Sequence, residues 1–140
     1  MRILIADDHE LVRGGLRSIL VARAGWEVCA EAADGREAIE KAKELKPDVV
    51  LLDITMPHVN GLDAARIIRR DVPHAKVIIL SQYDGSEMRA TALDAGAQGY
   101  VSKSDASSQL LIAIDALIDN YHRVPITTRA LPETSPCRRA

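Results

Sequence analysis

Two adjacent aspartates, Asp7 and Asp8, follow an apolar run near the start of the chain, in the sequence ILIADDHE. Neighbouring carboxylates repel one another, and burial adds to the free energy that their ionisation costs. A third aspartate, Asp53, ends the apolar run VVLLD, while Ser81 follows VIIL and Lys103 follows GYVS. Each of these five polar groups therefore stands at the end of a segment with the composition of a buried strand.

Residues of these types suit phosphoryl transfer. Three carboxylates around a small gap make a site for a hard cation, and Mg²⁺ fits better than Ca²⁺ because waters can complete its octahedron. A carboxylate beside that ion can attack phosphorus and form an aspartyl phosphate. Lys103 would neutralise charge, and the Ser81 hydroxyl would bind a phosphoryl oxygen. Any one of these residues alone is more often an ordinary loop residue, so the prediction rests on their joint placement.

Strand-like segments alternate with amphipathic, helix-like segments along the chain. Right-handed crossovers between such strands predict an α/β fold, a doubly wound five-stranded parallel sheet with five helices covering both faces. Ligands bind such sheets beyond the carboxyl ends of the strands, so the five polar groups should meet at one edge. The expected strands are 2–6, 26–32, 48–53, 76–80 and 99–102, and the expected helices are 10–23, 36–45, 62–71, 86–96 and 105–121.

Composition predicts one globular domain. The chain has 140 residues, of which 47% are hydrophobic and 27% charged, enough to build a core. It shows no membrane-length apolar run and no signal-peptide pattern, and Cys29 and Cys137 form no disulfide framework, so we expect a cytoplasmic protein without membrane contact. The net charge is −2, and four arginines lie within 122–140. The acidic remainder argues against direct nucleic-acid binding.

The last segment, 122–140, differs from the rest of the chain. It contains three prolines and has no periodic apolar pattern, which predicts a disordered tail or the start of an interdomain linker. It is too short to form a helix-turn-helix. We therefore expect a single domain over 1–121 and no effector domain within this sequence.

Four segments of the sequence together resemble a known family. The segments ADDHELVRGGL, VVLLDITMPHVNGLDAARII, VIILSQYD and AGAQGYVSKSDAS resemble the CheY-like receiver domain of bacterial two-component response regulators. The DDH opening and the GAQGYVSKS segment are most similar to the NarL/FixJ group. The resemblance extends over residues 1–121 and implies a flavodoxin-like fold with strand order 2-1-3-4-5.

The resemblance also implies roles for the acidic residues. Asp53 would be the phosphoacceptor, and Asp8 would bind Mg²⁺ directly. Asp7 would bind the ion through water, and the backbone carbonyl of Thr55 would be a further ligand. No organic cofactor is implied.

Three further residues would respond to phosphorylation. Lys103 would bind the phosphoryl group, Ser81 would be the switch hydroxyl, and Tyr100 would be the aromatic residue whose rotamer reports activation. In the family, proline very often follows the lysine in a cis bond, whereas this chain has Ser104, and a non-proline cis bond costs about 2.5–4 kcal/mol. The geometry of the Lys103–Ser104 bond is therefore left open.

The implied function is a signalling switch and not an enzyme. A sensor histidine kinase would phosphorylate Asp53 and change the surface formed by the fourth helix, fifth strand and fifth helix. The output would be transcription through an effector domain, or protein contacts of a free-standing receiver. The alternative is a phosphohydrolase of the haloacid-dehalogenase type, but its general acid would occupy the position of Thr55. The histidines His9, His58 and His74 have no ligand spacing and are expected to be structural or solvated.

Three apolar residues fall outside the core stripes of their helices. Ile112 lies opposite the stripe of the last helix, while Leu11 and Val21 are displaced from that of the first. Receivers similar to the NarL group often pair through these helices. Single exposed apolar residues are common, so the pattern alone leaves open whether these residues form an interface. The resemblance favours one and implies a two-fold homodimer centred on Ile112, weak at rest and strengthened by phosphorylation.

Overall fold

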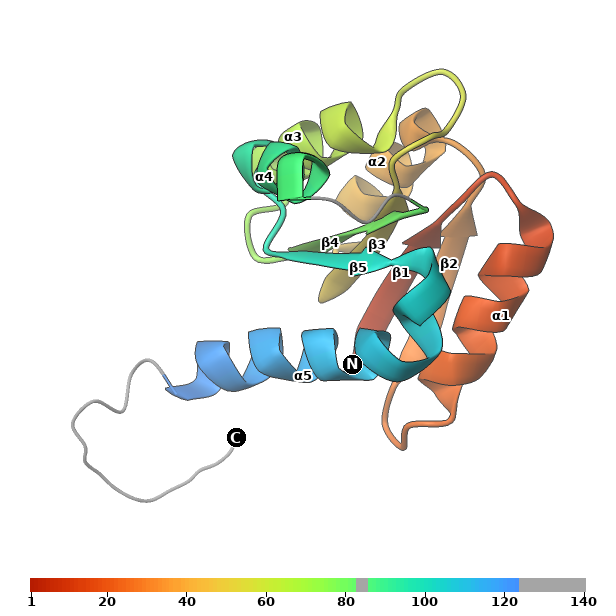
Figure 1. The fold of residues 1–140 in the computed structure, drawn as a ribbon, viewed down its shortest axis with the longest axis vertical. Helices are drawn as coiled ribbons and strands as arrows, with labels where there is room; N and C mark the ends of the chain where they lie inside the picture. The colour runs from red at the N-terminus through yellow and green to blue at the C-terminus, as the bar shows by residue number, and fades with distance from the viewer. Residues whose placement is uncertain (83–85, 124–140) are drawn as a thin grey trace.

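The computed structural model describes residues 1–82 and 86–123, with side chains in the last helix placed through residue 118. Strands and helices alternate along the described chain, as the sequence predicts (Figure 1). The strands are β1 (Arg2–Ala6), β2 (Glu27–Ala32), β3 (Val49–Asp53), β4 (Lys76–Ser81) and β5 (Gly99–Ser102). The helices are α1 (Glu10–Val21), α2 (Gly35–Leu45), α3 (Gly61–Asp71), α4 (Ser86–Asp94) and α5 (Ala106–Arg123), with a short 3₁₀ turn (Lys103–Asp105) before α5.

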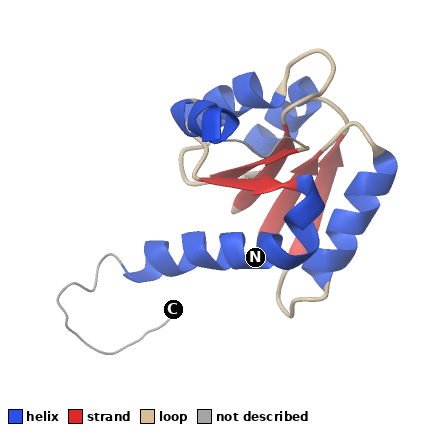
Figure 2. Ribbon diagram, viewed as in Figure 1, coloured by secondary structure: helices blue, strands red, loops and turns tan. Residues whose placement is uncertain are grey.

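The sheet is parallel throughout, with the order β2-β1-β3-β4-β5. Helices α1 and α5 cover one face, and α2, α3 and α4 cover the other (Figure 2). The predicted doubly wound α/β fold and its strand order are therefore confirmed. After β2 the chain crosses back over β1, so that β3 pairs with the other side of β1. Ala6 pairs with Leu52 near the carboxyl ends of these two strands.

Side chains that alternate along the strands divide between two cores, one on each face. The core beneath α1 and α5 contains Ile3, Ile5, Leu51, Ile78, Leu80, Leu16, Leu20, Leu110 and Ile114. The core beneath the other helices contains Leu4, Leu52, Ile79 and Ile68, together with alanines of α2 and α3. These small residues let the two helices lie close to the sheet. Both cores contain residues of β1 and β3. Packing therefore holds these two strands in place, and with them Asp7, Asp8 and Asp53 at their carboxyl ends.

Glycine is required at two points around the loop that follows β3. A Cβ on Gly61 would lie 2.1 Å from the backbone oxygen of Asp53, and one on Gly35 would lie 1.9 Å from that of Val59. Such contacts are far shorter than van der Waals distance, so the two backbone segments can lie this close together only where one of them has glycine. The loop is further held by the Gly61 N–H, which donates to the Ile54 oxygen at 2.8 Å.

Helix α5 continues to Arg123, two residues beyond the expected domain boundary at residue 121. The remainder of the expected tail, 124–140, lies outside the described residues. The Lys103–Ser104 peptide bond, which the sequence left open, is trans. Among the described helices, none has both the length and the apolar character needed to cross a membrane.

Candidate functional site

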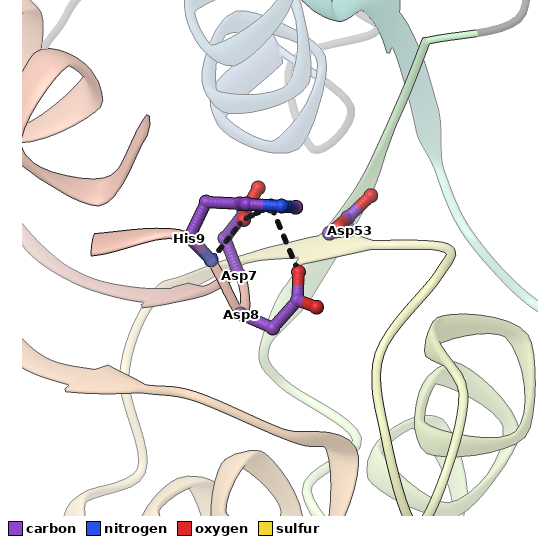
Figure 3. Close-up of side chains that lie close together, drawn as sticks. All are labelled: Asp7, Asp8, His9 and Asp53. Atoms are coloured by element: carbon purple, nitrogen blue, oxygen red, sulfur yellow. Dashed lines mark hydrogen bonds and ion pairs between the residues drawn. The ribbon is translucent and has the colours of Figure 1, made fainter. Parts of the chain in front are cut away.

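The three predicted aspartates meet beyond the carboxyl ends of β1 and β3 (Figure 3). Asp7 and Asp8 follow β1, and Asp53 is the last residue of β3. Potential ligand atoms of these residues and of His9 all lie within 4.8 Å of one another. The parallel pairing of β1 with β3 produces this convergence, since it aligns the two strand ends.

Asp7 is fully buried, although it carries a carboxylate. Its Oδ1 accepts a hydrogen bond from the backbone N–H of His9 at 2.8 Å. Its Oδ2 pairs with the Lys103 ammonium, whose nitrogen lies 2.8 Å away. The ammonium is the one close partner of this buried oxygen among the described residues, so its other lone pair is suited to a cation or a metal-bound water.

Asp53 is nearly buried, and Lys103 Nζ lies 3.2 Å from its Oδ2. Burial, together with the nearby charge of Asp7, raises the pKa of Asp53 above its ordinary value, and the Lys103 charge offsets only part of this. Burial alone would lower the pKa of Lys103, but its ion pairs with both carboxylates raise it. The site therefore holds an ammonium but retains an excess of negative charge.

The donor set fits Mg²⁺. All the predicted ligands offer oxygen, and the Asp8 side chain remains 31% exposed, so that water can reach the site. The backbone N–H of Thr55 lies close enough to the Asp53 carboxylate to lower its pKa, which places Thr55 beside Asp53. A small hard cation that retains several waters is the ion that such a site favours.

His9 was not predicted to contribute to the site. Its Nδ1 lies 3.0 Å from Asp8 Oδ1 and 3.3 Å from Asp7 Oδ1, while the side chain is 67% exposed. The imidazole therefore forms part of the rim of the acidic cluster. Its place immediately after the two aspartates is the sequence signal, which the spacing of histidines and cysteines alone does not reveal.

Ser81 and Tyr100, the two expected switch residues, lie on neighbouring strands. Ser81 is buried at the end of β4 and pairs in register with Ser102 of β5. Tyr100 is buried on β5, and the guanidinium carbon of Arg89, from α4, lies 4.9 Å from its ring centroid. This cation–π contact was not predicted, and it joins α4 to the aromatic ring.

The expected interface residues are exposed but face different sides. Leu11 is 91% exposed, Ile112 60% and Val21 50%. One side of Ile112 lines a hollow of about 330 Å³ beside Tyr100 and Arg89, and the rest of its side chain is open on the outer surface of α5.

Val21 lies one helical turn after Arg17, whose guanidinium pairs with Glu31 of β2. Residues four apart share a helix face, so Val21 faces the β2 edge. Helix α1 also packs against α5, and Arg23, in the turn after α1, pairs with Asp115 of α5 at 2.5 Å. Val21 and Ile112 therefore border different flanks of the α1–α5 layer.

Comparisons with known proteins agree with this geometry. Residues 3–115 match the family model described as "Response regulator receiver domain". The chain is 42% identical over 114 residues to the transcriptional regulatory protein LnrK of Bacillus subtilis (strain 168), covering 81% of this chain and 52% of LnrK. It is 44% identical over 114 residues to the chemotaxis protein CheY of Thermotoga maritima, covering 81% of this chain and 94% of that protein.

The fold also matches solved structures. A two-component response regulator of the LuxR family from Aurantimonas sp. SI85-9A1 superimposes with a TM-score of 0.81 and 40% identity, over 85% of each chain. The chain spans about half the length of LnrK but nearly all of CheY. The matched region includes both strand ends that form the acidic cluster and the lysine that pairs with it. This chain therefore belongs to the response regulator receiver domain family.

Proposed function

We propose that this chain is a phosphorylation-dependent signalling switch that accepts a phosphoryl group on Asp53 from a sensor histidine kinase. One observation carries the proposal: the Asp53 carboxylate ends a central strand beside both an ammonium, at 3.2 Å, and two further carboxylates. A nucleophile, a balancing cation and a metal-binding group are thus placed together. Phosphoryl transfer depends mainly on such positioning.

Asp8, Asp53 and the backbone carbonyl of Thr55 would hold Mg²⁺, with Asp7 bound through water. When bound, the ion would neutralise negative charge on the phosphoryl group in transfer. An Asp53 carboxylate oxygen forms the new bond to phosphorus as the bond between phosphorus and the donor breaks. Lys103 balances the charge of the phosphoryl oxygens, and its ion pair with Asp7 holds it in place for this.

The Ser81 hydroxyl would then bind a phosphoryl oxygen, and Tyr100 on the adjacent strand would change its rotamer. Such movement would alter the contact with Arg89 and the hollow between α4, β5 and α5. The switch is a population shift, limited by the difference in free energy between the two conformations. Phosphorylation would also favour a two-fold homodimer through α1 and α5, with Leu11 and Ile112 as its apolar contacts.

The output that we propose is control of transcription, exerted in the cytoplasm through an effector domain that is not part of 1–121. LnrK is a transcriptional regulator about twice as long as its matched region. The CheY match supports a free-standing receiver as the second candidate, because it covers almost that whole protein. The reading frame beyond Ala140 would distinguish the two. The haloacid-dehalogenase alternative gains no support, since the chain matches receivers over residues 3–115.

Acetyl phosphate with MgCl₂ tests the proposal, because a small donor requires only groups within this chain. We expect intact-mass spectrometry to show one phosphoryl group on the wild type and none on Asp53→Asn. Asp63→Asn is the matched control, because Asp63 lies on the exposed surface of α3. Undiminished phosphorylation of Asp53→Asn, or loss of phosphorylation in Asp63→Asn alone, would contradict the assignment of Asp53.

A further inference from the structure

Arg13 connects the acidic cluster to the edge strand of the sheet. Its Nη1 donates to the backbone oxygen of Asp7 at 2.6 Å, and its Nε donates to Glu31 Oε1 at 3.0 Å. The Arg13 side chain is only 16% exposed, and that of Glu31 is 22% exposed. One guanidinium thus joins α1, β2 and the peptide group between the two predicted metal-binding aspartates.

The orientation of that peptide group determines how Asp8 is presented to the site. The peptide unit is planar, so a hydrogen bond that holds the Asp7 carbonyl oxygen also fixes the direction of the bond from the Asp8 nitrogen to the Asp8 Cα. The preceding peptide group is held as well, because the Asp7 N–H donates to the Ala32 oxygen of β2 at 3.0 Å. Strand β2 therefore holds Asp7 on both sides, directly on one and through Arg13 on the other.

Glu31 is itself held in place by its neighbours. Its carboxylate also pairs with Arg17, and its backbone oxygen accepts a hydrogen bond from Lys41 Nζ of α2 at 2.5 Å. Arg17 approaches the same carboxylate, and among the described residues its ion pair is with Glu31 and not with Asp7. The two arginines thus share a partner and differ in whether they reach the aspartate loop.

We propose that Arg13 is a positioning residue for the metal site, which sets the affinity for Mg²⁺ by orienting the Asp7–Asp8 peptide group. The inference rests on the proposed function only in taking Asp8 and Asp53 as Mg²⁺ ligands. Outer-shell partners of metal ligands typically change metal affinity about 10–100-fold when they are lost. Arg13 does not touch the ion or the reacting atoms, so it acts through the loop that it holds.

The test is a titration of the metal-free protein with MgCl₂ alone, followed by calorimetry and by the amide resonances of Asp8 and Asp53. We expect Arg13→Gln to weaken Mg²⁺ binding about tenfold, the lower end of that range. Arg17→Gln, the matched control, should change it less than twofold. Arg13→Lys should fall between Arg13→Gln and the wild type, because one ammonium is too compact to reach both acceptors as the guanidinium fork does.

A double-mutant cycle separates positioning from a general loss of stability. Glu31→Gln should weaken Mg²⁺ binding in the wild type but have no further effect in Arg13→Gln, because Glu31 acts through Arg13. Urea unfolding of each variant gives its stability separately. If Arg13→Gln is folded and binds Mg²⁺ within twofold of the wild type, the inference is wrong. If Arg13→Gln does not fold, the cycle is made with Arg13→Lys instead. Effects of Arg13→Lys and Glu31→Gln on Mg²⁺ affinity that simply add in the double variant would also overturn the inference.

The readout also separates this inference from the proposed function. Mg²⁺ titration requires no phosphoryl transfer, so an unphosphorylated Asp53 would refute the switch and leave the role of Arg13 intact. If the switch is correct, phosphorylation of Arg13→Gln by acetyl phosphate should need about tenfold more MgCl₂ for half-maximal rate. At saturating MgCl₂ the maximal rate should be close to that of the wild type. A reduced maximal rate with unchanged MgCl₂ dependence would contradict a positioning role.

Discussion

The Lys103 ammonium lies closer to Asp7, at 2.8 Å, than to the predicted phosphoacceptor. Asp7 is fully buried, and the ammonium is the one close partner of its Oδ2 among the described residues. The ion pair therefore offsets most of the cost of a buried carboxylate, in addition to any role in phosphoryl binding. Lys103 therefore contributes to the stability of the metal-free fold, apart from its proposed role in binding a phosphoryl group.

Lys103→Met should consequently destabilise the metal-free protein by about 3 kcal/mol, the lower end for breaking a buried pair, since the lysine is partly exposed. The folded pKa of Lys103 is raised above its ordinary value of 10.5. Its stabilising effect is thus complete below the unfolded pKa and is lost as the pH rises through the folded pKa. Urea unfolding between neutral and strongly alkaline pH measures this. Equal stability of variant and wild type at neutral pH would show that the pair contributes nothing.

Asp53→Asn should have the opposite effect on the metal-free fold. The folded pKa of Asp53 is raised by burial and by Asp7, so ionisation destabilises the protein as the pH rises from about 3.8 through the folded pKa. Removing the charge should raise the melting temperature at neutral pH in EDTA by a few degrees. The gain should disappear below the unfolded pKa. A variant that melts below the wild type would mean that the Lys103 pair outweighs burial.

Mg²⁺ should stabilise the wild type by mass action, by about 2.7 kcal/mol at one hundred times its dissociation constant. Asp8→Ala should abolish this response, because it removes a direct ligand. It should cost the metal-free protein little, since Asp8 is partly exposed and pairs only with the exposed His9 among the described residues. Thermal melts with and without MgCl₂ measure the response, with Asp63→Asn as the control. A full Mg²⁺ response in Asp8→Ala would exclude Asp8 as a ligand.

Two glycines of α1 offer a contrast with the glycines around the site. A Cβ on Gly14 or Gly15 would meet no atom within 4 Å, so Gly14→Ala should stabilise the protein by about 1 kcal/mol through helix propensity. Gly61→Ala should instead destabilise it and weaken Mg²⁺ binding, because the new Cβ would collide with the Asp53 backbone. Urea unfolding compares the two. A destabilising Gly14→Ala would indicate that α1 approaches another molecule there.

Ile112→Glu should reduce the proposed dimerisation that a phosphoryl mimic induces. Leu11→Glu should do so as well, whereas Val21→Glu should have little effect, because Val21 faces β2. Sedimentation velocity with and without beryllofluoride measures the association. Dimerisation of Ile112→Glu equal to that of the wild type would place the interface elsewhere, and a loss in Val21→Glu alone would move it to the β2 edge.

The sequence predicted the fold and the convergence of the acidic residues because both depend on periodic patterns. Asp53 ends an apolar strand, and Asp7 and Lys103 directly follow one each. Parallel pairing brings such strand ends together whatever rotamers the side chains adopt. The contacts of Arg13 and Arg89 could not be predicted in this way. Both are long side chains whose partners, Glu31 and Tyr100, are set by rotamers and by how helices lie against the sheet.

The flank on which Val21 lies was missed for a related reason. Helical periodicity distinguishes a buried face from an exposed one, but it does not say which neighbour borders each flank. That depends on the ion pairs of Arg17 with β2 and of Arg23 with α5. An apolar residue displaced from the core stripe therefore indicates an exposed position, but it does not show which neighbouring strand or helix lies beside that position.

The central position of β1 also bears on the order of events in folding. Ile3 pairs with Val49 although β2 and α2 lie between them in the chain, so closing this loop costs entropy before any contact repays it. During synthesis, the first strand made has to wait for β3 to leave the ribosome before Asp8 and Asp53 can meet. An ion that needs both carboxylates then binds only after this pairing. Mg²⁺ should accordingly slow unfolding and leave the rate of folding nearly unchanged.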